Sequence, residues 1–193
     1  MRSAAPVPDV RLTYDDFLLF PDDGKRHELI DGVHYVTPAP RVRHQELVGR
    51  LHLALGNYLS EHTTAGRVLL APVDVVLSNH DIVEPDLLVI ASDQTGIVTE
   101  KNVQGAPALV VEVLSKRTRK RDVQIKRRLY EQRGVREYWL VDPELDTVQV
   151  LRLSPEGRLV RVEELTAEDG GTLSTPLLPG CGIDVRTLFR PTL

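Results

Sequence analysis

Hydrophobic residues recur along this chain with spacings that predict three helices. Between His44 and Glu61 they return every three or four positions and so share one helix face: Leu47, Val48, Leu51, Leu55, Tyr58 and Leu59. A shorter helix is predicted from Thr13 to about Phe20, with acidic residues in its first turn. A third is predicted over about Lys120 to Arg133, with Gly134 as its stop.

Shorter apolar runs predict β-strands between and after these helices. His27 to Ile30 and Val33 to Thr37 flank Asp31-Gly32, a pair typical of a two-residue hairpin turn. Further strands are predicted over Gly66 to Leu70, Val73 to Ser78, Ile82 to Ile90, Ala108 to Leu114 and Glu137 to Val141. A C-terminal β-hairpin over Val148 to Leu153 and Arg158 to Glu163 precedes a closing element over Ile183 to Phe189. This order is typical of an α/β fold.

The length of 193 residues fits one domain with a substantial core. Residues 1–12 are expected to form a loose tail, and residues 13–193 a single domain. Charged residues make up 27% of the chain and the net charge is −4, which argues against a protein that coats DNA. A local basic patch could still contact phosphates.

The cysteine count and the terminal sequence bear on the compartment. The single Cys181 excludes an intrachain disulfide framework and a cysteine-rich zinc module. No apolar stretch approaches the roughly 20 residues needed to cross a bilayer, and the N-terminus lacks the apolar core of a signal peptide. These features predict a cytoplasmic protein without a membrane partner.

Two acids interrupt the most apolar strand-like runs. Asp86 falls within Ile82 to Ile90 and Glu112 within Ala108 to Leu114. A buried carboxylate is costly unless it is paired or binds a cation, so the two acids together suggest a metal site. Two other interpretations stay open: Asp86 could cap a turn after Pro85, and Glu112 could form a buried ion pair.

A dense run of cations over Ser115 to Arg133 completes the groups needed for metal-dependent phosphodiester hydrolysis. Mg²⁺ prefers oxygen ligands and needs only one or two carboxylates, here Asp86 and Glu112, with a backbone carbonyl near Val113 as a further ligand. Mn²⁺ could substitute. The run is either a solubilising face or a track for backbone phosphates, with these expected contacts: Lys116, Arg117, Arg119, Lys120 and Arg127.

Four segments appear in an order that resembles a known family. They are Glu84-Pro85-Asp86, the strand Leu109 to Ser115 (LVVEVLS), the trio Asp122, Lys126 and Tyr130, and Gly134 to Pro143 (GVREYWLVDP). From about Glu28 to Leu153 the chain resembles a large bacterial family of restriction endonucleases within the PD-(D/E)XK nuclease superfamily. The resemblance implies a restriction-endonuclease-like core, with a central mixed β-sheet flanked by helices and a metal site at one sheet edge. The N-terminal and C-terminal hairpins would add to this core.

The chain departs from the superfamily pattern at one position. Leu114 stands two residues after Glu112, where a strand lysine is usual. Lys126 is the expected replacement because the resembling family places a lysine there, although a solvated helix surface would also explain it. Lys116 is the rival. By the same resemblance, Glu28 and His44 are possible accessory residues, with His44 otherwise a plain helix-start histidine.

The sequence therefore predicts a metal-dependent endonuclease that hydrolyses phosphodiester bonds, with DNA as the expected substrate. Asp86 and Glu112 would hold Mg²⁺, and Lys126 would either position the attacking water or stabilise the charge of the pentacovalent phosphorus. Such nucleases often act as two-fold dimers, so a homodimer is expected. The alternative is a non-catalytic nucleic-acid-binding or assembly module that keeps the fold, which the missing strand lysine motivates.

Overall fold

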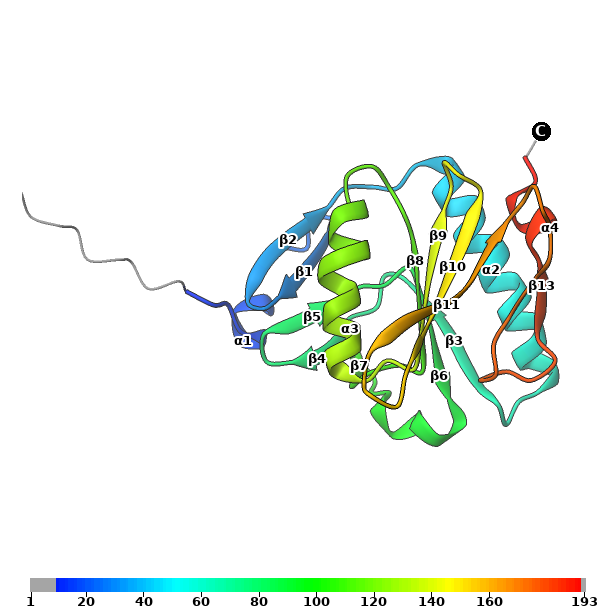
Figure 1. Ribbon diagram of the computed structural model, residues 1–193. Helices are drawn as coiled ribbons and strands as arrows, with labels where there is room; N and C mark the ends of the chain where they lie inside the picture. The colour runs from blue at the N-terminus through cyan, green and yellow to red at the C-terminus, as the bar shows by residue number, and fades with distance from the viewer. Residues whose placement is uncertain (1–9, 192–193) are drawn as a thin grey trace, which may run out of the picture.

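The computed structural model describes residues 10–191, in which a central six-stranded sheet is joined to a smaller five-stranded sheet (Figure 1). The central sheet has the order β11-β10-β9-β8-β6-β3, and only its β8–β9 pair is parallel. Its strands are β3 (Gly66–Leu70), β6 (Leu87–Ala91), β8 (Leu109–Val113), β9 (Glu137–Asp142), β10 (Thr147–Leu153) and β11 (Leu159–Thr166).

The smaller sheet has the order β2-β1-β5-β4-β7 and contains the predicted N-terminal hairpin. Its strands are β1 (Arg26–Ile30), β2 (Val33–Thr37), β4 (Val75–Ser78), β5 (Asp81–Val83) and β7 (Val103–Gln104). A two-stranded sheet of β12 (Thr172–Ser174) and β13 (Gly182–Asp184) lies near the C-terminus.

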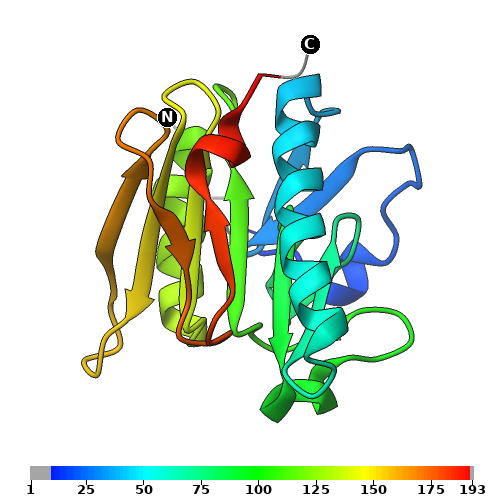
Figure 2. The same cartoon turned by 90° about the vertical axis from the view of Figure 1, so that its right-hand side faces the viewer.

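Helices cover both faces of the central sheet (Figures 1 and 2). The long helix α2 (Val42–Glu61) packs on one face, beside the C-terminal helix α4 (Val185–Phe189). On the other face, a π-helical segment η2 (Arg121–Lys126) continues into α3 (Arg127–Arg133). A short helix α1 (Tyr14–Phe17) and a 3₁₀ helix η1 (Ser92–Ile97) complete the elements.

Alternate residues of the central strands pack into two separate hydrophobic cores, one on each face of the sheet. Leu87 and Val89 of β6 pack with the apolar face of α2, whereas Leu88 and Ile90 pack with α3 and the smaller sheet. A strand buried on both faces shows no alternation of apolar and polar residues, which explains the continuous apolar runs in the sequence. The predicted mixed sheet between helices is confirmed.

The predicted strand Ile82 to Ile90 is wrong in one respect, because it is two strands in different sheets. β5 pairs with β1 and β4, whereas β6 pairs with β3 and β8. Pro85 lies between them and has no N–H group to donate to a ladder, so the chain can leave one sheet here and enter the other. Asp86 therefore lies just before β6 rather than inside a strand.

Other boundaries also differ from the predictions. Helix α1 ends at Phe17 rather than near Phe20, and the side chain of Thr13 caps its N-terminus. The helix predicted from Lys120 begins with a π-helical segment, and the closing element divides into β13 and α4. Most of the predicted N-terminal tail lies outside the described residues, but the N–H of Leu12 donates to the Gly32 carbonyl, 2.9 Å away.

Candidate active site

The antiparallel pairing of β6 and β8 brings the two predicted metal-binding acids together. Leu87 is the register partner of Val111, so one further step along the pair places Asp86 opposite Glu112. Both acids line a cavity of about 460 Å³ between the end of these strands, β1 and η2. The predicted meeting of the two carboxylates is therefore a property of the sheet register.

Asp86 is buried and accepts contacts on both oxygens. Oδ1 accepts a hydrogen bond of 2.7 Å from Nη1 of Arg26, and Oδ2 accepts one of 2.9 Å from the N–H of Val113. Nε2 of His44 lies 3.1 Å from Oδ2. Burial works to raise the pKa of Asp86, but His44 and Arg26 outweigh it and lower the pKa to about 2. Asp86 is thus a carboxylate at neutral pH.

Glu112 is buried on β8 and lies beside the side chain of Lys126. Oε1 of Glu112 accepts a hydrogen bond of 2.7 Å from Nζ of Lys126 and one of 3.0 Å from the Tyr130 hydroxyl. Burial raises the pKa of Glu112, and the charges of Asp122 and Asp86 add to this, although Lys126 opposes it. The charge on Glu112 therefore depends on nearby cations.

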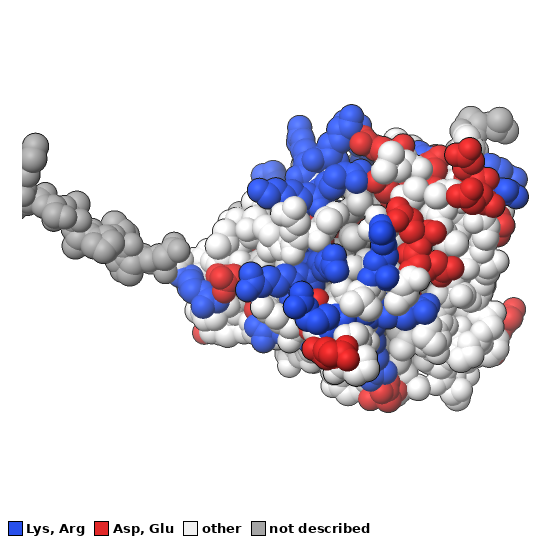
Figure 3. All heavy atoms as spheres, in the orientation of Figure 1, with Lys and Arg blue, Asp and Glu red and all other residues white. Residues whose placement is uncertain are grey.

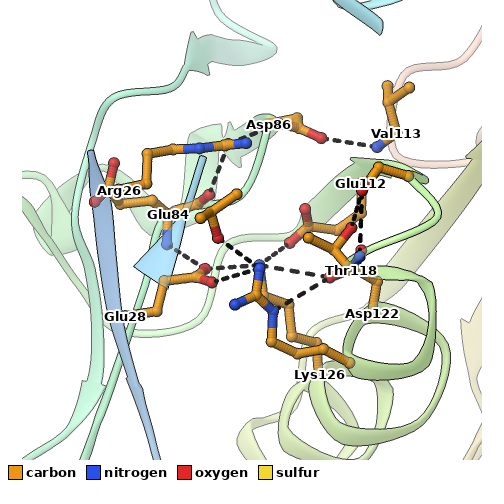
Figure 4. A network of polar contacts seen from close by, with 12 residues as sticks. Arg26, Glu28, Glu84, Asp86, Glu112, Val113, Thr118, Asp122 and Lys126 are labelled. Atoms are coloured by element: carbon orange, nitrogen blue, oxygen red, sulfur yellow. Dashed lines mark hydrogen bonds and ion pairs between the residues drawn. The ribbon is translucent and has the colours of Figure 1, made fainter. Parts of the chain in front are cut away.

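Lys126 lies at the centre of a group of carboxylates (Figure 4). Nζ is 2.6 Å from Oε1 of Glu28, 2.7 Å from Oε1 of Glu112 and 3.9 Å from Oδ1 of Asp122, and the side chain is only 2% exposed. Burial works to lower the pKa of Lys126, but these charges outweigh it and raise the pKa. Lys126, and not the rival Lys116, is the lysine next to Glu112: Lys116 is 69% exposed and lies 3.4 Å from Glu144.

The local backbone explains how a helix lysine reaches the strand. The wider turns of η2 include both Asp122 and Lys126, and both side chains are buried against the sheet. π-helical turns occur mostly as short insertions in α-helices, frequently at functional sites. Tyr130, on the following turn of α3, shares this face, as the spacing predicted.

Glu28, a predicted accessory residue, belongs to this group. Its Oε1 accepts from Lys126 and, at 3.0 Å, from the N–H of Glu84, while Oε2 lies 3.4 Å from Nη2 of Arg121. Burial works to raise the pKa of Glu28, but Lys126 and Arg121 outweigh it and lower the pKa. Among the described residues, Oε2 of Glu28 and Oδ1 of Asp122 are buried without a hydrogen-bond donor.

His44, the other accessory residue, contacts Asp86 from the first turns of α2. Its ring is buried, and its Nδ1 has no hydrogen-bond partner within residues 10–191. His44 therefore connects α2 to the acid at the start of β6.

The five predicted phosphate contacts are distributed over different surfaces. Lys116 and Arg117 line the cavity. Arg119 pairs with Asp142 at 2.7 Å and, with Lys120, lines a second hollow against β9 and β10. Nη2 of Arg127 donates to the Leu159 carbonyl at 2.6 Å. Figure 3 shows the basic side chains gathered around α3, with an acidic area beside them.

Sequence reasoning missed several residues that line the cavity. Arg26, Arg41 and Arg121 supply cations from β1, the start of α2 and η2, and Glu84 adds a carboxyl group. Burial raises the pKa of Glu84 to about 7, and the charges of Asp74 and Glu28 contribute. Glu84 precedes Asp86 by two positions, but nothing in the local sequence connects Arg26 to an acid 60 positions away.

Two findings over the described residues bear on the other predictions. Among the helices of residues 10–191, none is long and apolar enough to cross a membrane. Within the same residues, no three His, Cys, Asp or Glu side chains are already arranged as a metal site. The latter agrees with the geometry at Asp86, whose two oxygens already receive donors from the protein.

Comparisons with known proteins relate this chain to a nuclease family. A family model described as "Uma2: Putative restriction endonuclease" matches residues 14–186. A crystal structure of a "putative nuclease belonging to DUF820" from Anabaena variabilis ATCC 29413 is similar, with 21% identity and a TM-score of 0.75. The alignment covers 92% of this chain and 97% of that one. No curated protein matches the chain. The structural likeness confirms the restriction-endonuclease-like fold.

Proposed function

Because the chain belongs to the Uma2 family of putative restriction endonucleases, we propose that it is a metal-dependent endonuclease that hydrolyses phosphodiester bonds in DNA. The observation that carries this proposal is the arrangement of Asp86, Glu112 and Lys126. A carboxylate just before β6 and another on the neighbouring strand β8 share a cavity with a buried ammonium group, 2.7 Å from the second of them. Lys126 thus supplies the cation that the strand lacks at Leu114.

The residues in the cavity fit Mg²⁺ by their donor chemistry. Asp86 and Glu112 provide hard carboxylate oxygens, and Asp122 and Glu28 each have a buried oxygen without a hydrogen-bond donor. In the proposal Asp86 and Glu112 hold the ion, and the backbone carbonyl of Val113 is a further candidate ligand. The ion would supply charge neutralisation at the phosphoryl oxygens and an activated water.

Lys126 is proposed as the electrostatic partner of the reacting phosphate. Its raised pKa keeps the ammonium group protonated at neutral pH, so it is a poor proton acceptor. The water oxygen bonds to phosphorus and gives up a proton to solvent, while one P–O ester bond breaks and the departing oxygen takes up a proton. Negative charge builds on the phosphoryl oxygens during this step. A fixed cation beside them stabilises that charge. The Tyr130 hydroxyl and Glu28 hold Lys126 and Glu112 in place.

Arginines on two rims of the cavity are suited to hold the DNA backbone. Arg41 lies at the start of α2, and Arg117 lies in the turn after β8. Both are exposed, and neither forms an ion pair with any residue of the described chain. Cations of this kind contact phosphates without reading sequence. A two-fold dimer, the form we propose, would present two such cavities to the two strands.

Incubation of purified protein with supercoiled plasmid and with single-stranded DNA, in Mg²⁺, Mn²⁺ or EDTA, tests the proposed activity. We expect nicked or linear product with either metal ion and none in EDTA. Binding of DNA without cleavage in any metal ion would instead support the non-catalytic binding module. Cleavage that persists in EDTA would contradict the metal-dependent mechanism.

A further inference from the structure

The contact between Arg26 and Asp86 indicates a role for Arg26 that the proposed chemistry does not include. Asp86 must offer an oxygen to the metal ion, yet both oxygens receive donors in this structure. Three of the roughly four lone-pair sites of this carboxylate are therefore in use, so a metal ion at Asp86 lies beside these donors and competes most strongly with a positively charged one. This reasoning rests on the proposed function, in which Asp86 is a metal ligand.

The three donors to Asp86 differ in how easily they can leave. The Val113 N–H belongs to the backbone of β8, and His44 is buried in the first turns of α2. Arg26 is the first residue of β1, and its side chain is 20% exposed. Its second hydrogen bond, to the Glu84 carbonyl, is long at 3.5 Å. Arg26 is thus the donor that can move at least cost.

The charges favour the same exchange. Five buried carboxyl groups line the cavity, namely those of Glu28, Glu84, Asp86, Glu112 and Asp122. Without a metal ion, Arg26 supplies part of the positive charge that this group needs. A guanidinium group stays charged at all ordinary pH values, so a divalent cation at Asp86 repels it.

The released side chain would remain in the cavity. Arg26 lines this space together with Arg41 and Lys126, and Figure 4 shows its side chain beside Asp86 and Glu84. A guanidinium group binds phosphate oxygens in a bidentate manner. We propose that the guanidinium group of Arg26 occupies the place of the metal ion beside Asp86 until a metal ion binds. The side chain of Arg26 then contacts a phosphate of the substrate.

Metal affinity in the absence of DNA provides the first test. Calorimetric titration with Mn²⁺ should show about tenfold tighter binding to Arg26→Gln than to the parent, because a competing charge-assisted hydrogen bond is removed. Arg26→Lys keeps the charge and should bind Mn²⁺ close to the parent value. Arg43→Gln is the matched control: Arg43 lines the same cavity but pairs with Asp146 at 2.7 Å, and its replacement should leave the Mn²⁺ affinity unchanged.

Substrate binding should change in the opposite direction. Arg26→Gln should raise KM for a short duplex severalfold in saturating Mn²⁺, and Arg26→Lys should recover part of this loss. A residue with a purely structural role would not tighten metal binding while weakening substrate binding. Thermal unfolding checks that the variant folds. In EDTA the Tm of the parent should be higher than that of Arg26→Gln, and in Mn²⁺ the difference in Tm should disappear.

The outcomes separate this inference from the proposed function. If the parent binds Mn²⁺ and Asp86→Asn does not, the metal site stands; equal Mn²⁺ affinity of the parent and Arg26→Gln then overturns the role of Arg26 alone. If neither the parent nor Arg26→Gln binds Mn²⁺ at millimolar concentration, both proposals fail. Binding by Arg26→Gln but not by the parent supports both.

Discussion

The ammonium group of Lys126 lies 2.7 Å from Oε1 of Glu112, although Lys126 is on a helix and Glu112 is on a strand 14 positions earlier. The position two residues after Glu112 is Leu114, which is buried in the core beneath α3. The helix lysine therefore places a cation next to the strand carboxylate while the strand keeps an apolar side chain. A missing strand lysine does not mean that the cavity lacks one.

Replacement of Lys126 should destabilise the protein strongly. Lys126→Met leaves Glu28 and Glu112 without their shared cation, and loss of one partner from a buried ion pair costs about 3–5 kcal/mol. The cost should be smaller at pH 5 than at pH 8, because the unpaired carboxyl groups can then take up protons. Urea unfolding at both pH values measures this.

A second substitution provides the control for Lys126. In Lys126→Met/Glu112→Gln one of the unpaired charges is absent, so the double variant should be less destabilised than the sum of the single variants. Strict additivity in the free energy of unfolding would mean that the two side chains do not interact as described.

The two rim arginines should contribute to DNA affinity by their charge. Arg41→Ala and Arg117→Ala should each weaken DNA binding and lower the slope of log affinity against log salt by about 1, as expected for the loss of one phosphate contact. Fluorescence anisotropy of a labelled duplex over a range of salt concentrations measures both quantities. Arg161→Ala is the control, since Arg161 lies on β11 and pairs with Glu164. An unchanged slope in both rim variants would exclude these arginines from the binding surface.

Glu84 should make the metal-free protein less stable as the pH rises. Burial raises its pKa from 4.5 to about 7 in the folded protein, so the folded state binds more protons than the unfolded state between these values. Stability from this group therefore falls as the pH increases through this window. Glu84→Gln should flatten the dependence of Tm on pH between about 5 and 8 in EDTA. Parallel curves for parent and variant would show that Glu84 is not the group responsible.

Parts of the fold could be predicted because the signal is local. One-sided burial gives α2 its helical spacing, and Gly134 ends α3 because its φ of 79° suits glycine. The division of β5 from β6 could not be predicted from spacing, because the run is apolar on both sides of Pro85. The choice of sheet depends on partners distant in sequence.

In the site, too, the residues with a local signal could be predicted and those that depend on distant partners could not. Asp86 and Glu112 were recognisable because each interrupts an apolar run, and both line the cavity. Arg26 gave no signal, because its pairing with Asp86 depends on the joining of two sheets. The burial of Lys126 was equally hidden, since the surrounding run is rich in arginine and lysine and is typical of a solvated helix face.

The most direct test of the proposed site is the rate of plasmid cleavage in Mg²⁺ by Asp86→Asn and Glu112→Gln, beside the parent. Asp93→Asn is the control, because Asp93 lies on η1 and pairs with the exposed Arg136. Circular dichroism would verify that each variant is folded. We predict a rate at least about a hundredfold lower for both site variants and an unchanged rate for the control. Cleavage by folded Asp86→Asn and Glu112→Gln at the parent rate would contradict the assignment of this cavity as the catalytic site.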